Sequence, residues 1–472
     1  MRAPLGGRAR SDLGAVMTTN TSRREFLRRQ AALAGLGVAA PWAMNLAALS
    51  AAAAQSVGDD YRALVCVFQF GANDCHNTVL PLDAATYQAY AGIRTSIALP
   101  LADLAATEVA PLNAWPDGRR MALHPALAPL KTLFDDGRVA LAMNVGTMAG
   151  PITLADYNAG RGKPPKLFSH NDQQATWQSG GTDSPSGWGG RAADLMLQGN
   201  GAAGLFTAIT TGGGLFVTGA NATAYQVGNN GSTEVAKVFG SDAATAAIKR
   251  LMQRASSHDF EEAHAAVARQ SIAADLKVRA AIGSGTTLVF PDTSLGNQLK
   301  IVARLIAARA ELGFNGTGPK RQVFFVSAGG WDMHNNLIAD HPGRLGEVAG
   351  AMKAFYDATV TLGLADKVTT FTASDFGRTL SNNGDGSDHG WGGYHFVLGN
   401  AVDGKRWFGQ LPAMAVNGPH DVGGGRLLPA IAVDQYAATL ASWFGVAATD
   451  LASVVPRIGL YDKADLGFMK TA

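Results

Sequence analysis

Side chains that can act as acids, bases, nucleophiles or metal ligands are concentrated in four short segments of the chain. Each segment follows an apolar run and combines Asp, His, Ser or Asn with nearby glycine, and six of the 10 histidines lie in or near the four. The segments are residues 70–77, 168–180, 329–336 and 373–393. Four such segments in one chain favour a site that binds a cation.

The third segment has the most informative spacing. Asp332 and His334 are two residues apart, and in extended backbone such side chains point the same way, so both can address one ion. Mixed Asp and His ligands suit zinc or manganese, whereas carboxylates alone suit magnesium or calcium. Asp74 and Asp375, each after an expected strand, would complete a site for two ions about 3.5–4 Å apart. A hydroxyl beside those ions, such as that of Ser169, would become a nucleophile.

Each of these residues also has a structural interpretation when it is taken alone. An Asp that follows a buried strand often caps the next helix, which is the alternative for Asp74. Ser169 equally suits a turn or a helix cap, and its neighbour His170 suits general acid or base chemistry. The planar fork of Arg378 suits the binding of anionic oxygens, and a salt bridge is its alternative.

Strands that alternate with helices must position the four segments. Residues 63–70 form a near-continuous apolar run that ends at Gly71, which is typical of a buried parallel strand. The pattern predicts an α/β fold with a mostly parallel central sheet flanked by helices, in which ligands gather at the carboxyl edge of the strands. Further strands are expected at residues 139–145, 322–326, 368–372 and 395–398, and helices at 127–134, 298–312, 345–362 and 435–444.

The middle of the chain departs from this alternation. Residues 200–232 are rich in Gly, Thr and Asn and predict an insertion that carries a hairpin. Residues 243–281 predict one or two long amphipathic helices. We therefore expect one domain over residues 55–472, with residues 181–292 as an insertion or cap.

The N-terminus has the pattern of an export signal. Arg23 and Arg24 precede Phe26 and Leu27 in a twin-arginine motif, and an apolar, alanine-rich stretch follows as far as residue 54. The small residues at its end favour cleavage over membrane anchoring. We expect a twin-arginine (Tat) signal peptide over residues 1–54, the Tat translocon as a partner during export, and a periplasmic or secreted protein with no stable membrane anchor after cleavage.

Charge and cysteine content exclude two classes of site. The formal net charge is +2, but residues 1–54 hold seven arginines against two acidic residues, so the remaining chain is mildly acidic. Such a chain does not suit nucleic-acid binding that is driven by phosphate neutralisation. The 2 cysteines cannot form a disulfide framework or a Cys-rich metal site, and we expect free or buried thiols.

The four segments resemble domain-of-unknown-function family 1501, a set of mostly exported bacterial proteins in the alkaline-phosphatase-like (sulfatase/phosphatase) superfamily. The resemblance covers about residues 60–445 and rests on Gly-Gly-Trp-Asp-x-His at 329–334, Asp-Phe-Gly-Arg-Thr at 375–379 and Asp-His-Gly-Trp-Gly-Gly at 388–393. It implies an alkaline-phosphatase-like fold that holds one or two divalent ions, zinc or else manganese, magnesium or calcium. The metal ligands that it implies are Asp74, Asp332, His334, Asp375, Asp388 and His389.

The same resemblance implies a metal-dependent hydrolase of phosphate or sulfate esters with Ser169 as the nucleophile. Arg378 and His170 would assist catalysis, and the substrate would be a small or polymeric anionic ester. One departure favours a different function, because Phe376 stands where the superfamily has a histidine ligand. The alternative is therefore a catalytically degenerate exported protein that binds an anionic ligand, a glycan or a protein partner.

Overall fold

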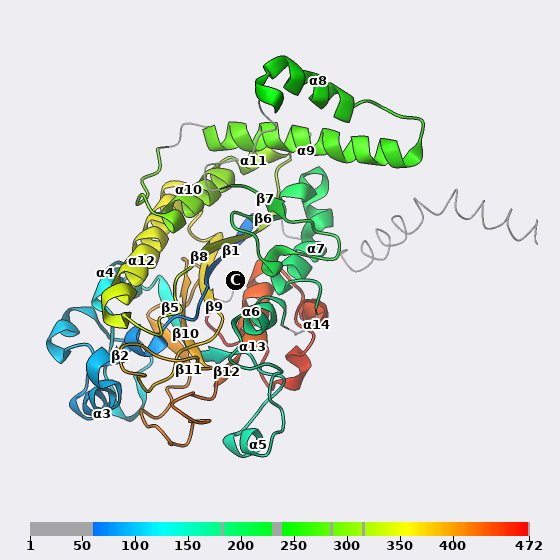
Figure 1. Cartoon of the computed structure of the whole chain (residues 1–472). Helices are drawn as coiled ribbons and strands as arrows, with labels where there is room; N and C mark the ends of the chain where they lie inside the picture. The colour runs from blue at the N-terminus through cyan, green and yellow to red at the C-terminus, as the bar shows by residue number, and fades with distance from the viewer. Residues whose placement is uncertain (1–59, 181–183, 229–237, 284–286, 314–316, 471–472) are drawn as a thin grey trace, which may run out of the picture. The chain divides into compact units, whose positions relative to one another are not determined.

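The computed structural model describes residues 60–180, 184–228, 238–283, 287–313 and 317–470 (Figure 1). The expected signal peptide, residues 1–54, lies outside the described residues. Residues 55–472 belong to one compact unit. No helix in the described ranges has the length and apolar character needed to cross a membrane.

The centre of the fold is a 9-stranded sheet with the order β11-β5-β10-β9-β1-β8-β6-β7, in which β12 also pairs with β5. Only β10 runs antiparallel to its neighbours, so the prediction of a mostly parallel α/β sheet is confirmed. The five expected strands are all present. The strand bounds are β1 Arg62–Gln69, β5 Val139–Gly146, β6 Ala208–Thr210, β7 Tyr225–Gln226, β8 Arg321–Ala328, β9 Val368–Ser374, β10 Gly393–Leu398, β11 Arg406–Gly409 and β12 Ile431–Ala432.

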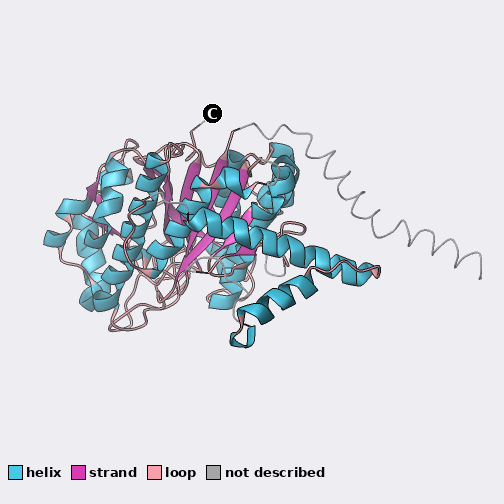
Figure 2. Cartoon of the chain, turned by 90° about the horizontal axis from the view of Figure 1, so that it is seen from above, coloured by secondary structure: helices cyan, strands magenta, loops and turns pink. Residues whose placement is uncertain are grey.

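Helices cover both faces of this sheet (Figures 1 and 2). Alternate residues of β1 point to opposite faces, with Val65 in one apolar core and Cys66 in the other. The first core includes residues of α4 (Ala128–Asp135), α9 (Asp259–Gly283), α10 (Ser294–Ala307), α11 (Arg309–Leu312) and α12 (Leu337–Thr361). The second includes residues of α6 (His170–Ser179), α7 (Trp188–Asn200), α13 (Val433–Phe444) and α14 (Leu451–Val454).

The register of the central strands brings three chemistry-bearing segments to one edge. Gln69, at the end of β1, lies opposite Ala328 of β8 and Ser374 of β9, so the loops that follow all three strands leave the sheet together. Because β10 runs the other way, its first residue, Gly393, faces this same edge. The residues just before β10 therefore join the loops that follow β1, β8 and β9.

The middle of the chain differs from expectation in one respect. The long helical region is two helices, α8 (Asp242–Met252) and α9, as the pattern allowed (Figure 2). The short strands β6 and β7 pair in parallel and extend the central sheet beyond β8, so they do not form the predicted hairpin. This part of residues 181–292 thus belongs to the main sheet.

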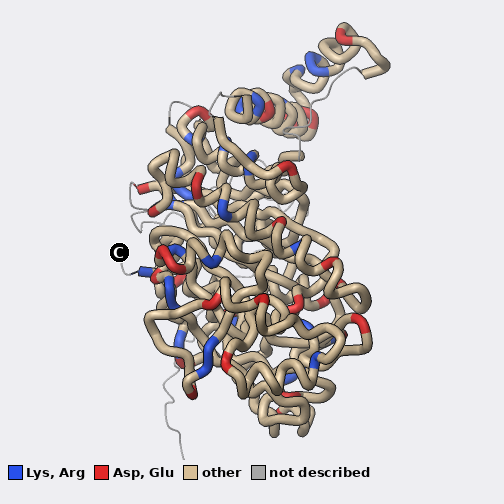
Figure 3. The backbone as a smooth tube through the Cα atoms, turned by 90° about the vertical axis from the view of Figure 1, so that its left-hand side faces the viewer, with Lys and Arg blue, Asp and Glu red and all other residues tan. Residues whose placement is uncertain are grey.

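Smaller features complete the fold. A three-stranded antiparallel sheet joins β2 (Val79–Pro81), β4 (Met121–Leu123) and β3 (Glu108–Val109) beside α3 (Ala84–Arg94), and the short helix α5 is Leu154–Asn158. Both cysteines are free and buried, as predicted. Cationic and anionic residues are interspersed, and neither sign dominates the view in Figure 3.

Candidate metal centre

Four side chains from three separate segments meet at the carboxyl edge of the sheet. Asp332 and His334 come from the loop after β8, His170 is the first residue of α6, and His389 precedes β10. One ligand atom each of His170, Asp332 and His389 lie within 4.8 Å of one another. His334 Nε2 adds a fourth donor, 3.0 Å from His389 Nε2 and 3.0 Å from Asp332 Oδ1. We call these four residues the donor cluster.

The spacing of His170, Asp332 and His389 fits one ion. His170 Nε2 lies 3.0 Å from His389 Nε2 and 3.4 Å from Asp332 Oδ1, and His389 Nε2 lies 3.5 Å from the same carboxylate oxygen. Four ligands around zinc at about 2.0–2.1 Å would lie roughly 3.3 Å from one another. A His/Asp/His triad that can hold a metal is therefore present, with His334 beside it.

The outer nitrogens of the three imidazoles each face an oxygen. His389 Nδ1 lies 2.7 Å from the carbonyl oxygen of Phe168, and His170 Nδ1 lies 2.6 Å from Asp375 Oδ2. His334 Nδ1 lies 3.1 Å from Asp388 Oδ1. A carbonyl or carboxylate oxygen only accepts, so in each neutral ring the proton is on Nδ1 and the lone pair of Nε2 points into the cluster. Protein ligands of metals are oriented in this way.

The protonation of the cluster also favours a cation. Hydrogen bonding to Asp375 raises the pKa of His170, whereas burial lowers the pKa of His389. Without an ion, a proton between their two Nε2 atoms would therefore stay on His170. Burial, the largest single effect, would raise the pKa of Asp332, but the hydrogen bond and charge of Arg378 together with His170 and His334 lower that pKa overall. The cluster thus offers an ionised carboxylate, and a metal ion would replace the proton on His170.

Asp375 and Asp388, predicted as ligands, contact the cluster through histidines. Asp375 Oδ2 also accepts hydrogen bonds from Gln174 Nε2 at 2.9 Å and from the Gly71 amide at 3.2 Å. Its side chain is 0% exposed, whereas that of Asp388 is 51% exposed. Both carboxylates are therefore placed to orient imidazole ligands, and the buried one is the more rigidly held.

Arg378 is fully buried and its donors are occupied. It donates to the backbone oxygens of Ala72 at 3.1 Å, Ser387 at 3.0 Å and Gly71 at 3.0 Å. It also forms an ion pair with Asp332. The guanidinium therefore ties the loops after β1 and β8 to the segment before β10, which matches the salt-bridge interpretation of this residue.

Asp74 lies in a separate buried network. Its carboxylate pairs with Arg94 Nη2 at 2.6 Å, accepts from Ser387 Oγ at 2.6 Å, and caps a short helical turn through the Asn77 amide at 3.0 Å. Burial, the largest single effect, would raise the pKa of Asp74, but Arg94, His341, His76 and the Ser387 hydrogen bond together lower that pKa. Among the described residues, none of the four cluster residues is a recorded hydrogen-bond partner of this carboxylate.

Phe376 packs against two histidines of the donor cluster, His170 and His389. Its ring centroid lies 4.9 Å from that of His170 and 5.0 Å from that of His389. The ring thus gives the imidazoles an apolar wall that restricts their rotation. His395 lies away from these rings, in the core against Trp177 and Tyr436.

Ser169 is the residue before α6 and adjoins the ligand His170 in the chain. Its hydroxyl donates a hydrogen bond to Asp172 Oδ2 at 2.6 Å, and Asp172 also pairs with Lys166. The Ser169–Asp172 distance is within the range needed for proton transfer. A hydroxyl and a carboxylate that can accept its proton are therefore in contact where the chain leads into His170.

Sequence reasoning missed several groups that shape the site. Gln174 donates to Asp375, and the Phe168 carbonyl accepts from His389 Nδ1. Neither group has a local sequence signal. Gly71 does have one, because it ends an apolar run: its φ is +113°, and a Cβ there would lie 2.6 Å from the Asp332 amide nitrogen. Only glycine lets the loops after β1 and β8 approach this closely.

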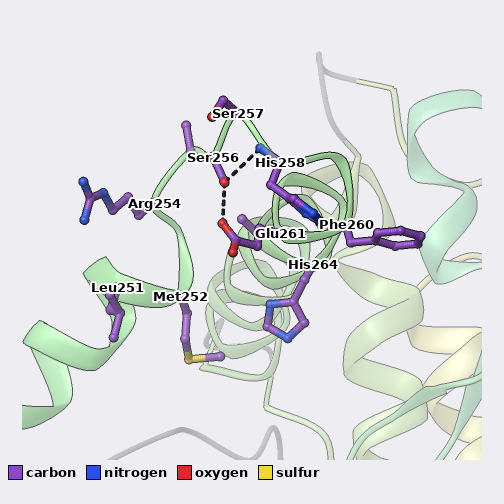
Figure 4. Close-up of a pocket in the computed structure, with 11 residues that line it drawn as sticks. Leu251, Met252, Arg254, Ser256, Ser257, His258, Phe260, Glu261 and His264 are labelled. Atoms are coloured by element: carbon purple, nitrogen blue, oxygen red, sulfur yellow. Dashed lines mark hydrogen bonds between the residues drawn. The ribbon is translucent and has the colours of Figure 1, made fainter. Parts of the chain in front are cut away.

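A separate groove lies where α8 and α9 meet (Figure 4). Its volume is about 840 Å³, and Leu251 and Met252 line it together with Phe260 and His264. Glu261 there accepts a hydrogen bond from Ser256 Oγ at 2.5 Å. Across the described part of the chain, the only group of three or more side chains that could hold a metal ion is His170, Asp332 and His389.

Comparison with known proteins shows which family the chain belongs to. A search of curated proteins found no match. A family model described as "Protein of unknown function (DUF1501)" matches residues 61–441, which extend from β1 into α13 and include the whole donor cluster. This match covers most of the sequence, and the chain belongs to the DUF1501 family.

Proposed function

We propose that the protein is an exported, metal-dependent hydrolase of phosphate or sulfate esters with an alkaline-phosphatase-like fold. The observation that carries the proposal is the convergence of the two imidazoles of His170 and His389 with the Asp332 carboxylate, with the imidazole of His334 beside them. Each of the three imidazoles is held by an oxygen on its other nitrogen. Nitrogen-rich ligands favour zinc over magnesium or calcium. The residues that would hold the ion are His170, Asp332 and His389, and His334 lies beside them.

A bound ion supplies positive charge that stabilises the oxygens of a reacting ester. In the proposed reaction, Ser169 Oγ attacks the phosphorus or sulfur atom and Asp172 takes its proton. The bond to the ester oxygen breaks, and the alcohol leaves after it gains a proton. Water then releases phosphate or sulfate from Ser169.

Substrate access supports catalysis over a purely structural metal site. The Asp332 side chain is 47% exposed and that of His334 43%, so one side of the donor cluster faces solvent. Structural zinc sites are closed, whereas catalytic sites keep a position open to solvent. The anionic ester would enter from the side of Asp332 and His334.

Metal analysis combined with an ester panel tests the proposal. The purified mature protein is expected to contain about one zinc ion per chain and to hydrolyse an aryl phosphate or an aryl sulfate. Ser169→Ala should abolish turnover while zinc content stays constant, because the hydroxyl is outside the donor cluster. Ser184→Ala removes a hydroxyl from another part of the chain and is the control. A folded, zinc-containing wild type that cleaves neither ester would contradict the proposal.

Two observations favour the second candidate, a non-catalytic exported protein that binds an anionic ligand, a glycan or a protein. Phe376 occupies space beside His170 and His389 with a ring that cannot bind a cation. The Asp74 carboxylate is already neutralised by Arg94. The failed ester panel above, with the metal still bound, is the result that this candidate predicts.

Export by the Tat translocon to the periplasm or medium is part of the same proposal. Its support is the twin-arginine motif at Arg23 and Arg24 in the sequence. Changing both to lysine should retain the protein in the cytoplasm, which cell fractionation measures.

A further inference from the structure

Arg426 lies at the edge of the donor cluster and is held rigidly there. Its Nε donates to the backbone oxygen of His389 at 3.0 Å, and its Nη1 donates to the backbone oxygen of Gly423 at 3.0 Å. The guanidinium also stacks on the Phe168 ring, with its central carbon 5.0 Å from the ring centroid. Since the Phe168 carbonyl accepts from His389 Nδ1, Arg426, His389 and Phe168 form one closed set of contacts.

The loop that carries Arg426 is itself clamped. The buried carboxylate of Asp421 accepts hydrogen bonds from the amides of Gly423 at 2.7 Å, Gly425 at 3.0 Å and Asn417 at 2.7 Å. A Cβ at Gly424 would lie 3.0 Å from Arg426 Nη1, so glycine leaves the guanidinium its space. The side chain is thus ordered before any ligand binds, which lowers the entropic cost of using it.

One terminal nitrogen of Arg426 remains free. Nη2 has no protein acceptor within the described ranges, and the side chain is only half-buried. Arg378, in contrast, donates hydrogen bonds to backbone oxygens and forms an ion pair with Asp332. Arg426 is therefore the arginine at this centre that can still donate to an outside ligand.

Charge balance points to the same role. Asp332, Asp375 and Asp388 surround the histidines, and a divalent ion together with Arg378 would offset their three negative charges. A dianionic ligand needs a further cation, and the Arg426 guanidinium supplies one beside His389. A guanidinium is also the side chain that best matches the geometry of phosphate or sulfate oxygens.

We propose that Arg426, through its free Nη2, binds the tetrahedral anion of the substrate beside the donor cluster. The identity of that anion as the phosphoryl or sulfuryl group of an ester rests on the proposed function. The assignment moves the anion-binding role that the sequence offered to Arg378 onto a residue more than 30 positions later in the chain.

Calorimetric titration of the zinc-loaded mature protein with inorganic phosphate and inorganic sulfate tests this role. Arg426→Gln should weaken phosphate binding at least about tenfold, because a charge-assisted hydrogen bond is lost. Arg426→Lys should bind with intermediate affinity, since an ammonium keeps the charge without the fork. Arg120→Gln, which removes the same charge from an exposed pair with Glu108, is the control and should bind as wild type does.

Three results would overturn the inference. If Arg426→Gln binds phosphate and sulfate with the same affinity as wild type, Arg426 does not contact the anion. A wild type that binds neither anion would exclude the site. Loss of zinc from Arg426→Gln in proportion to loss of phosphate would make Arg426 a positioning residue for His389 instead. Anion binding that depends on Arg426 without turnover of any ester would leave this inference standing and refute the proposed hydrolase.

Discussion

Replacing Asp375 by asparagine is the most direct test of how the donor cluster is held. Asp375 Oδ2 accepts from His170 Nδ1 at 2.6 Å, Gln174 Nε2 at 2.9 Å and the Gly71 amide at 3.2 Å. These three donors should keep the amide oxygen of the new side chain in the same position, so the geometry persists while the negative charge is lost. Loss of such a partner behind a histidine ligand costs about 10–100-fold in metal affinity. That range corresponds to about 1.4–2.8 kcal/mol.

Competition with a chromophoric chelator measures the zinc affinity, and thermal unfolding shows whether each variant is folded. The chain offers a matched control, because Asp388 accepts from His334 Nδ1 in the same way but is 51% exposed, whereas Asp375 is 0% exposed. Solvent screens the charge of Asp388, so Asp388→Asn should change zinc affinity by no more than about threefold.

Three outcomes would refute this reasoning. Zinc affinity of Asp375→Asn equal to that of wild type would mean that the buried carboxylate does not orient His170. Complete loss of zinc binding in a folded Asp375→Asn protein would mean that Asp375 is itself a ligand, as the sequence resemblance implied. A larger loss of zinc affinity in Asp388→Asn than in Asp375→Asn would show that burial of the carboxylate does not determine its contribution to zinc binding.

Three further predictions concern the whole fold. Removing the ion with a chelator should lower the midpoint of thermal unfolding, because an ion at 100 times its dissociation constant stabilises the folded state by about 2.7 kcal/mol. Adding zinc back should restore the midpoint. A midpoint that the chelator leaves unchanged would argue against a bound ion. Gly71→Ala should destabilise the protein by about 1–3 kcal/mol or more and weaken zinc binding, since φ is +113° and the new Cβ would meet the Asp332 amide. In the control Gly118→Ala, where φ is +68° and the new Cβ would meet no atom, stability should fall while zinc affinity stays the same. Burial lowers the pKa of His395 from 6.5 to about 3, so below pH 6.5 the unfolded chain binds a proton that the folded chain does not. The free energy of unfolding should therefore fall as the pH decreases, by about 2 kcal/mol at pH 5 from this residue. Chemical denaturation at pH 7 and pH 5 measures the fall, and His395→Phe should remove this residue's share of it.

The sequence predicted the strands and their carboxyl-edge chemistry because both follow from local patterns. An apolar run that ends at a glycine, as residues 63–71 do, specifies a buried strand and the start of a loop. It does not specify direction, since a buried strand has the same apolar pattern in either orientation. The antiparallel course of β10 is fixed by contacts such as Val397 with Phe371, and these are invisible in a local window.

The same limit applied to the site. The two-residue spacing of Asp332 and His334 predicted that their side chains lie together, and they do. The position of His170 in the cluster depends instead on a hydrogen bond with Asp375, 205 residues away. Arg378 has the sequence context of an anion-binding residue, yet the backbone oxygens of Gly71 and Ala72 take up its donors. Which polar groups are already satisfied is a property of the tertiary fold and is not written into any motif.

The wide separation of the cluster residues along the chain has a consequence for biosynthesis. His170 and His389 lie 219 positions apart, and His389 is ordered by the segment that leads into β10. During translation the earlier ligands emerge first and stay apart until the last one has left the ribosome and its strand has joined the sheet. Ion capture would therefore occur only in a chain that is almost completely synthesised and folded, so that a filled centre would mark a finished molecule and a truncated one would remain empty.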